Sequence, residues 1–285
     1  MSIEYDKTKK FACLLGSPVA HSISPAMHNY SFERLGINAK YYAIDVTSDD
    51  LKKVMKDIRA TDFLGANVTM PLKNEIIKYL DKLDISSELA GAVNTIVPIN
   101  GQLVGYTTDG AGFVESLREI EVDVKNKDIL VLGAGGAATS VIVELAIDKA
   151  NSITIAKRFN KTIDDVRAFA NKVTDKTNCS TTLIDIEDNN ALKEAIEECH
   201  ILINATPVGM TSNKSLIDKS YLRKELVVCD LIYEPPMTKL LLDASEVGCR
   251  YLNGKYMLLY QGARSFKLWT NNDMPVKEVK AEYFS

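Results

Sequence analysis

The sequence predicts an α/β protein with two domains, the first built on a mixed sheet and the second on a parallel sheet. Strand-like and helix-like segments alternate along all 285 residues, which favours parallel strands joined by helices. Asn100-Gly101 between two apolar segments is a hairpin signal, so one antiparallel pair is expected in the first sheet. A glycine-rich turn after residue 132 opens the regular series of strands and helices that forms the second sheet. We place the first domain at residues 1–107 and 255–285 and the second at residues 108–254.

The elements follow one another in a regular order. Ser24-Pro25 predicts a helix start with serine as N-cap, and Gly36 predicts the end of that helix. The last two helical segments have no strand left to cross to, so we expect them to fold back on the first domain. The first domain should have strands at 11–15, 41–46, 65–69, 94–97 and 102–106 and helices at 25–35, 51–59 and 72–80. The second should have strands near Ile129, Ile153, Thr181, Ile201 and Val227, with helices such as 162–173 and 191–198, followed by the terminal helices 256–269 and 276–284.

Composition and charge exclude several classes of function. The hydrophobic content of 46% and charged content of 25% are typical of a soluble globular protein. A net charge of −4 and a pI near 5.6 argue against a nucleic-acid binder. No apolar stretch approaches a membrane span, and residues 1–10 are charged rather than signal-like, so we expect a cytoplasmic protein. Five scattered cysteines and three unclustered histidines indicate neither a disulfide framework nor a metal site. Monomer and homodimer both remain open.

The glycine-rich turn predicts a dinucleotide site. Gly133 allows a tight exit from the strand, and Gly135 lets the backbone approach a pyrophosphate on the helix N-terminus. Ala138 keeps helix and sheet close, so the segment fits the G-x-G-x-x-G/A fingerprint of a Rossmann-type NAD(P)-binding domain. Tight packing without a ligand is the alternative. The loop residues that we expect to bind the cofactor are Gly133, Ala134, Gly135, Gly136 and Ala137.

Basic residues follow the next strand, where NAD-binding proteins often have an acid. Lys157, Arg158 and Lys161 stand there, and no Asp or Glu ends that strand. A guanidinium holds a phosphate in a fork and lysine adds a point charge, so these residues favour NADP over NAD. The alternative is that they form a solvated surface.

Pairs of small polar residues mark two candidate substrate-binding segments. Ser22 and Ser24 are two apart, so in an extended segment both hydroxyls would face the same way. An N-cap explains Ser24 equally well but leaves Ser22 unexplained. Asn67 and Thr69 repeat the pattern at the end of a short apolar strand, where ligands collect in parallel sheets. Turn chemistry before Pro71 is the competing explanation.

Lys73 and Asp109 are candidates for acid–base chemistry. We expect Lys73 on the first turn of a helix, where the helix dipole disfavours a positive charge; an ordinary surface lysine is the alternative. Asp109 follows another strand and precedes a helix, where an N-cap is the routine role. If the two meet, the carboxylate orients the ammonium, which can then give a proton to a carbonyl oxygen as hydride reaches the carbon. Asn94 offers an uncharged donor and acceptor, whereas Tyr233 and Gln261 are weak candidates with core packing and a solvated face as alternatives.

Taken together, these segments resemble the shikimate dehydrogenase family over essentially the full length. The strings that carry the resemblance are GSPVAHSISPAMHN, GANVTMPLK, AGAVNTI, GYTTDGAGF, LVLGAGGAA, INATPVGM, CDLIYEPPMT and MLLYQGA, and the segment 261–275 looks more like the quinate/shikimate branch.

The resemblance implies a substrate domain, a Rossmann domain and reversible NAD(P)-linked oxidation of shikimate to 3-dehydroshikimate, with quinate as a second substrate. It implies that Lys73 and Asp109 form the catalytic pair and that Ser22 and Ser24 hold the substrate carboxylate. It further implies substrate contacts at Asn67, Thr69, Asn94, Tyr233 and Gln261, and cofactor contacts at Thr206, Pro207, Gly254 and Met257.

Two residues depart from the family pattern. Lys157 stands where the family usually has Asn, and Tyr256 precedes Met257 where a glycine is common. Tyr256 is the one feature that favours a catalytically silent, ligand-sensing relative. A dehydrogenase of another small acid is disfavoured, because the paired serines replace an arginine clamp.

Overall fold

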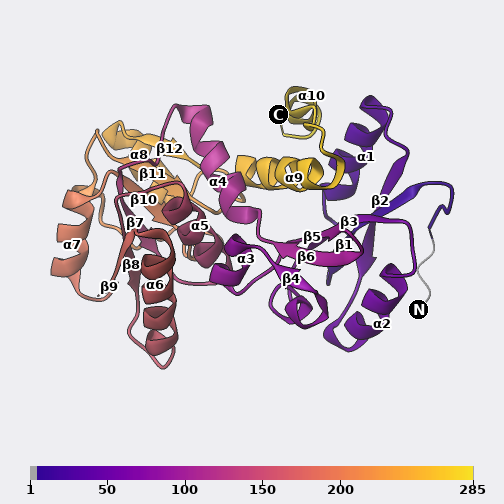
Figure 1. Cartoon of the computed structure of the whole chain (residues 1–285). Helices are drawn as coiled ribbons and strands as arrows, with labels where there is room; N and C mark the ends of the chain where they lie inside the picture. The colour runs from indigo at the N-terminus through magenta and orange to yellow at the C-terminus, as the bar shows by residue number, and fades with distance from the viewer. Residues whose placement is uncertain (1–4, 285) are drawn as a thin grey trace. The chain divides into compact units, whose positions relative to one another are not determined.

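The computed structural model describes residues 5–284 and divides the chain into two compact units (Figure 1). Unit 1 holds the residues up to Thr108 together with those from Leu259 onward, and unit 2 holds Asp109–Leu258. The sequence placed these two boundaries after residues 107 and 254. One unit has a mixed sheet and the other a parallel sheet, which confirms the predicted fold class.

Unit 1 contains a six-stranded mixed sheet in the order β2-β1-β3-β5-β6-β4. β1 pairs in parallel with β2 and β3, whereas β5 runs antiparallel to β3 and β6. The carboxyl ends of β1, β2 and β3 therefore lie at one edge of the sheet. The elements of this unit, apart from the terminal helices, are β1 (Lys10–Gly16), α1 (Ser24–Arg34), β2 (Ala39–Asp45), α2 (Ser48–Ile58), β3 (Phe63–Val68), the 3₁₀ helix η1 (Glu75–Tyr79), β4 (Lys82–Leu83), α3 (Ile85–Ala90), β5 (Thr95–Ile99) and β6 (Gln102–Tyr106).

The hairpin forms where the sequence predicts it. Asn100 and Gly101 connect β5 to β6, and their φ angles are 51° and 78°. Two residues with positive φ are what a type I′ turn requires, and the twist of that turn matches the twist of paired strands. The hairpin prediction is confirmed.

The helix expected at residues 72–80 is wrong. The structure has a turn at Lys73, the short 3₁₀ helix η1, and then β4 and α3, which the sequence did not reveal. Tertiary hydrogen bonds override the local helical pattern: Val93 N–H donates to the Lys73 carbonyl at 2.8 Å, and Leu103 N–H donates to the Asp81 carboxylate at 2.7 Å. Asp84 then caps α3 by accepting a hydrogen bond from the N–H of Ser87.

The C-terminal helices are α9 (Lys255–Thr270) and α10 (Val276–Tyr283), and from Leu259 onward they belong to unit 1. The indole of Trp269 lies against Gly65 of β3 so closely that a Cβ at Gly65 would overlap the ring. Its Nε1–H donates to the carbonyl of Ile96 at 3.0 Å. α10 packs on α1 through an edge-to-face contact between Tyr283 and Tyr30. The glycine of the GANVTMP segment thus provides the space that the returning helix fills.

His28 of α1 is fully buried in this region. Its ring stacks on Tyr41 with centroids 4.5 Å apart, and Trp269 and Phe266 lie beside it. Burial lowers the pKa of His28 from its ordinary value of 6.5 to about 3. Folding therefore keeps this imidazole neutral over a range of pH in which the unfolded chain binds a proton.

We expect unit 1 to lose stability as the pH falls from about 6.5 towards 3. Below pH 6.5 the unfolded state takes up one proton at His28 that the folded state does not, so unfolding becomes easier by about 1.4 kcal/mol per pH unit. Urea unfolding followed by the fluorescence of Trp269, the single tryptophan, measures this slope. His28→Phe should reduce the slope by about that amount. An undiminished slope in His28→Phe would contradict the assignment.

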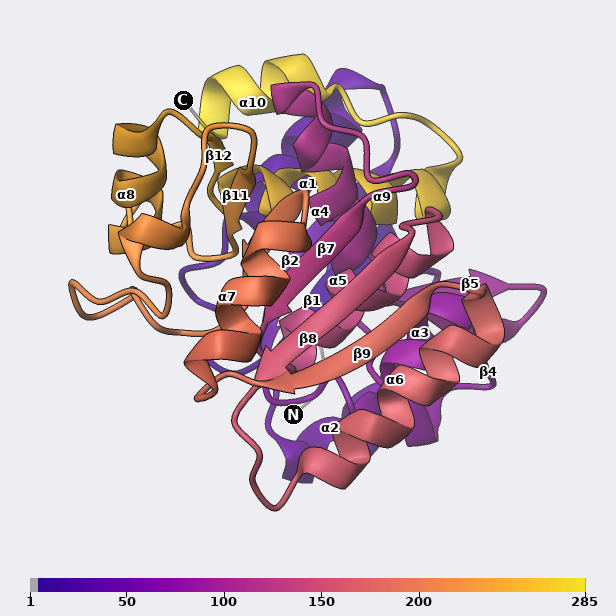
Figure 2. The same cartoon turned by 90° about the vertical axis from the view of Figure 1, so that its left-hand side faces the viewer.

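Unit 2 is a doubly wound parallel sheet in the order β12-β11-β10-β7-β8-β9. The chain enters at β7 in the middle, steps outward to β8 and β9, and then crosses over to β10, β11 and β12. This is the Rossmann strand order, whose switch point lies between β7 and β10. Figure 2 shows β7, β8 and β9 side by side with α6 and α7 nearby. The elements are α4 (Asp109–Leu117), the 3₁₀ helix η2 (Arg118–Ile120), β7 (Asp128–Leu132), α5 (Gly136–Ile147), β8 (Ser152–Lys157), α6 (Ile163–Thr177), β9 (Ser180–Asp185), α7 (Asn189–Glu198), β10 (Ile201–Asn204), the 3₁₀ helix η3 (Lys219–Tyr221), β11 (Val227–Asp230), α8 (Lys239–Val247) and β12 (Arg250–Leu252).

Each unit has its own apolar core. In unit 1, Phe11, Leu15 and Val68 of the sheet pack with Leu51 and Ile58 of α2. In unit 2, strand residues pack against α7 and α8; the cluster includes Leu130, Leu132, Leu202, Val228, Leu192, Ile196, Leu240 and Leu241. These cores hold the carboxyl ends of the strands in place, and the candidate site residues lie at or beside those ends.

Candidate active site

Asn67 and Asn94 anchor a buried polar network in unit 1. Asn67 lies near the end of β3, and its Oδ1 accepts a hydrogen bond from the Tyr41 hydroxyl at 2.9 Å. Its Nδ2 therefore faces Ser265 Oγ, also at 2.9 Å. Asn94 Oδ1 accepts from the backbone N–H of Thr108 at 2.7 Å, and because an amide nitrogen only donates, the orientation of Asn94 is fixed.

The fixed orientation of Asn94 directs its Nδ2 to Oε1 of Gln261, at 3.4 Å. Gln261 lies on α9 one turn before Ser265, whose hydroxyl reaches the Gln261 carbonyl at 3.0 Å. Three predicted substrate contacts, Asn67, Asn94 and Gln261, are therefore brought together within one unit. A buried network whose members are hydrogen-bonded to one another holds its polar atoms rigidly.

Besides the Tyr41 hydroxyl, three hydroxyls in this network were not predicted. Thr95, Thr108 and Ser265 lie 2.8 to 3.2 Å from one another. Thr95 and Thr108 adjoin the predicted residues Asn94 and Asp109, so their position in the motifs was a usable signal. For Ser265, the only signal in the sequence was its spacing of four residues from Gln261, which places both on the same face of a helix.

The two serines lie at the start of α1, but the predicted local geometry is wrong. The N-cap is Ile23 rather than Ser24, and the Ile23 backbone is helical, with φ −76° and ψ −15°, so the segment is not extended. Ser22 supplies the local hydrogen bond instead, because its Oγ accepts from the N–H of Ser24 at 3.2 Å. Ser24 is buried as the first helical residue, and Ser22 is half-buried.

Lys73 lies in the turn between β3 and η1, not on the first turn of a helix. Lys73 stood out in the sequence because a helix dipole would disfavour its positive charge. For a residue in a turn, that cost does not apply. Its backbone is held next to Asn94: the Lys73 carbonyl accepts from Val93, and the Asn94 carbonyl accepts from Val68 N–H, both at 2.8 Å. Thr69, directly after β3, is half-buried and donates its N–H to Leu15.

Asp109 is the first residue of α4 in unit 2 and is 9% exposed. The next residue, Gly110, allows α4 to lie directly on α5, since a Cβ there would overlap the Ser140 carbonyl. The position of Asp109 is therefore set by the helix that follows the glycine-rich turn.

The glycine-rich turn has the shape that a pyrophosphate requires. Gly133 has φ +101°, and a Cβ there would lie 2.9 Å from Thr206 Cγ2. Gly135 and Gly136 have open space around them, and no side chain caps the start of α5. The first amides of α5 are thus accessible to an anion, while Ala138 is fully buried against the sheet. These residues fit a dinucleotide; Ala134 and Ala137, predicted with them, are half-buried and exposed, respectively.

The basic residues after β8 have different surroundings. Lys157 Nζ donates to Asn160 Oδ1 at 3.0 Å and to Thr162 Oγ1 at 2.8 Å, so its ammonium shapes the loop that follows. Arg158 is 73% exposed, and its Nε lies 3.7 Å from Oε1 of Glu187. Lys161 is exposed in the same loop.

The loops after β10 and β11 share a buried carboxylate. Asp230 is 1% exposed, and burial raises its pKa. It accepts from Asn204 Nδ2 at 3.0 Å, and Asn204 Oδ1 in turn accepts from the Thr206 hydroxyl at 2.7 Å. Thr206, a predicted cofactor contact, is thus fixed through a pair of residues that the sequence did not single out.

The remaining predicted residues are less constrained. Pro207 follows Thr206 and is exposed, and Tyr233 is 51% exposed. Gly254 packs so tightly that a Cβ would overlap the Leu231 carbonyl. Met257 is half-buried in the first turn of α9, as is Tyr256, the residue at the usual family glycine.

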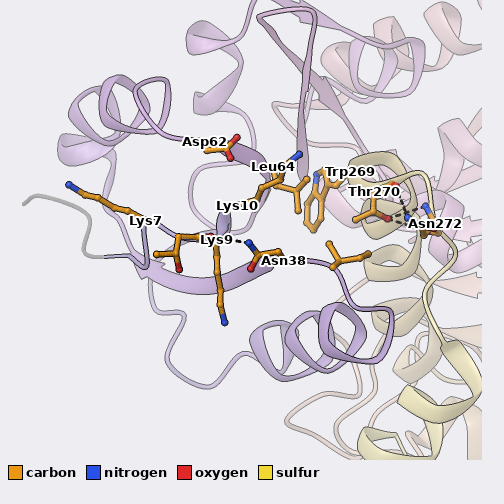
Figure 3. Close-up of a pocket in the computed structure, with 11 residues that line it drawn as sticks. Lys7, Lys9, Lys10, Asn38, Asp62, Leu64, Trp269, Thr270 and Asn272 are labelled. Atoms are coloured by element: carbon orange, nitrogen blue, oxygen red, sulfur yellow. Dashed lines mark hydrogen bonds between the residues drawn. The ribbon is translucent and has the colours of Figure 1, made fainter.

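A cavity of about 350 Å³ lies elsewhere on unit 1, at the opposite ends of its strands (Figure 3). Lys10, Asn38 and Asp62 line it where β1, β2 and β3 begin. Lys7 and Lys9 also line it but point in different directions, so their charges do not converge on one ligand. Within residues 5–284, no group of three or more His, Cys, Asp or Glu side chains could hold a metal ion. No helix in the same range is long and apolar enough to cross a membrane.

These features define a class of protein. A Rossmann unit with an open glycine-rich helix start, and a second α/β unit with a rigid cluster of small polar side chains, are the parts of an NAD(P)-dependent oxidoreductase for a small polar substrate. Family models match the chain in three segments: the shikimate dehydrogenase substrate binding domain at residues 14–96, shikimate / quinate 5-dehydrogenase at 115–231 and the shikimate 5′-dehydrogenase C-terminal domain at 256–282. The chain belongs to the shikimate dehydrogenase family, which confirms the resemblance found in the sequence.

Known relatives are similar along nearly the whole chain. A shikimate dehydrogenase (NADP(+)) from Listeria innocua is 42% identical over 274 residues, covering 95% of this chain and 94% of the relative. The crystal structure of shikimate 5-dehydrogenase from Listeria monocytogenes in complex with shikimate and NAD has 40% identity and a TM-score of 0.93, covering 99% and 98% of the two chains. Quinate dehydrogenase from Corynebacterium glutamicum in complex with NAD has 26% identity and a TM-score of 0.85, covering 97% and 99%.

Proposed function

We propose that this protein catalyses the reversible NAD(P)-dependent reduction of 3-dehydroshikimate to shikimate, in the biosynthesis of chorismate and the aromatic amino acids. The observation that carries the proposal is family membership over 95% of the chain with every predicted catalytic and substrate-binding residue of the family motifs present. The buried network around Asn67 and Asn94 supports it, because directional donors and acceptors suit a polyhydroxylated ring better than an apolar ligand.

Each residue has a proposed role. When bound, the nicotinamide cofactor supplies or accepts the hydride. Lys73 gives a proton to the substrate oxygen in the reductive direction and takes it back in the oxidative one, and Asp109 supports its charge. Ser22 and Ser24 hold the carboxylate. The proposed contacts to the ring hydroxyls are Asn67, Thr69, Asn94 and Gln261, with Tyr233 lining the substrate.

The proposed cofactor site is the glycine-rich turn with the loops beside it. The amides at the start of α5 would bind the pyrophosphate, and Arg158 and Lys161 would bind a 2′-phosphate. Lys157 would contribute by shaping their loop. Thr206, Pro207, Gly254 and Met257 would line the nicotinamide end. We propose NADP as the favoured cofactor and NAD as an accepted one.

Quinate is the second candidate substrate. The similarity to the quinate dehydrogenase of Corynebacterium glutamicum and the composition of segment 261–275 favour it. The extra ring hydroxyl of quinate would need its own partner, because an unpaired buried hydroxyl is costly. A silent ligand-sensing relative is the different-class alternative, favoured only by Tyr256.

A steady-state matrix of shikimate and quinate against NADP and NAD tests these proposals. We expect the highest kcat/KM for shikimate with NADP, and lower values for quinate and for NAD. Binding of shikimate with no turnover under any of the four conditions would identify the silent relative. Turnover of quinate above that of shikimate would reverse the order of substrates.

We also propose a cellular location and consider the oligomeric state. All five cysteines are unpaired and buried, which supports the expected cytoplasmic location. Both the monomer and the homodimer remain compatible with the proposed activity, and sedimentation of the purified protein distinguishes them.

A further inference from the structure

No acidic residue ends β8, but acidic residues lie at and after the end of the neighbouring strand β9. β8 and β9 pair in parallel with Lys157 opposite Asp185, so their carboxyl ends adjoin. The N–H of Ile186 donates to the Lys157 carbonyl at 3.2 Å and continues this pairing by one residue. Residues that follow β9 are therefore held beside the basic residues that follow β8.

Three acidic residues lie at and after the end of β9: Asp185, Glu187 and Asp188. The side chains of Asp185 and Asp188 accept hydrogen bonds from backbone N–H groups. Asp185 Oδ1 accepts from the N–H of Glu187 at 3.1 Å. Asp188 Oδ1 caps α7 by accepting from the N–H groups of Asn190 and Ala191. Glu187 lies between this turn and this cap, so its backbone is fixed, and its side chain is the one that faces Arg158.

The basic residues after β8 likewise differ in whether their side chains are bonded within their own loop. Lys157 is engaged by Asn160 and Thr162 within its own loop. Arg158 projects into solvent, as Lys161 does in the same loop, and Glu187 Oε1 lies 3.7 Å from the Arg158 Nε. A guanidinium beside a carboxylate is partly neutralised, so a phosphate that binds Arg158 must compete with Glu187 for it.

We propose that Glu187 is a cofactor-specificity residue, which competes with a ribose 2′-phosphate for Arg158 and so narrows the preference for NADP over NAD. The proposal rests on the proposed dinucleotide site. Both side chains are largely exposed, so the competition is modest and is screened by salt.

The test is calorimetric titration of the whole protein with NADPH and with NADH. We expect Glu187→Gln to tighten NADPH binding by about fivefold at low salt and to leave NADH within about twofold. The gain should shrink in 0.5 M salt, where the Debye length is only a few ångströms. Glu194→Gln, an exposed acid on α7, is the matched control for net charge and should change neither Kd.

The same titrations in an Arg158→Gln background separate the mechanisms. If Glu187 acts through Arg158, Glu187→Gln should no longer tighten NADPH binding there. An unchanged NADPH to NADH ratio in the single variant, or the same gain without Arg158, would overturn the proposal. Failure of the unsubstituted protein to bind either cofactor would instead count against the proposed dinucleotide site.

Discussion

Lys73→Ala is expected to lower kcat by about a hundredfold to ten-thousandfold and to leave KM for shikimate within about threefold. The physical reason is that a proton donor acts mainly in the transition state, where charge develops on the substrate oxygen, and contributes little to ground-state binding. Initial rates with varied shikimate at saturating cofactor measure the two constants. A kcat that falls steeply at unchanged KM identifies Lys73 as a proton-transfer group.

The matched control for this variant is Lys78→Ala. Lys78 lies in the same unit, and its Nζ pairs with Glu75 at 2.8 Å on the surface, so its removal changes the net charge equally. We expect its kcat to stay within about twofold, because an exposed pair contributes little. If Lys73→Ala weakened shikimate binding and turnover to the same extent, Lys73 would be a binding residue instead.

Gly135→Ala is expected to weaken both NADPH and NADH by about tenfold or more while leaving the folded protein intact. The space around Gly135 is open, and its φ of −81° suits any residue, so a methyl group meets no protein atom. The methyl group would, however, lie where the pyrophosphate must approach the amides of α5, and such overpacking typically costs about 1–3 kcal/mol. Cofactor titration and the melting temperature together measure this outcome.

Gly133→Ala provides the contrast within the same turn. Its φ of +101° disfavours a side chain, and a Cβ would press on Thr206. This variant should therefore lose thermal stability as well as cofactor affinity. Unchanged affinity of Gly135→Ala for both cofactors would show that the turn does not serve the pyrophosphate.

The order and type of most elements could be predicted from the sequence because they are long enough to show a hydrophobic period. Among the elements that were missed are the two-residue β4, the six-residue α3, the three-residue β12 and the three-residue η2 and η3, which are too short for a period to appear. The helix predicted at residues 72–80 was wrong because hydrogen bonds from Val93 and Leu103, residues far along the chain, fix that segment.

The candidate site could be predicted only where its residues sit in recognisable motifs. Asn67, Asn94 and Gln261 were found in this way, and the structure joins them in one network. Ser265 was missed because its partners Thr95 and Asn67 are 170 and 198 residues away in the chain. The geometry of Ser22 and Ser24 was misjudged because Ile23 adopts a helical conformation that its sequence does not reveal.

The backbone N–H of Thr108 restricts which side chain position 94 can hold. Aspartate would still accept the Thr108 bond, but it would turn a carboxylate towards the Gln261 oxygen in place of a donor. Leucine has a similar volume but would leave that buried N–H without its acceptor. Histidine would present a ring too large for a site that is 3% exposed. Asparagine satisfies both neighbours and these three residues do not, so a search for altered substrate range in this protein should vary other positions and keep this one unchanged.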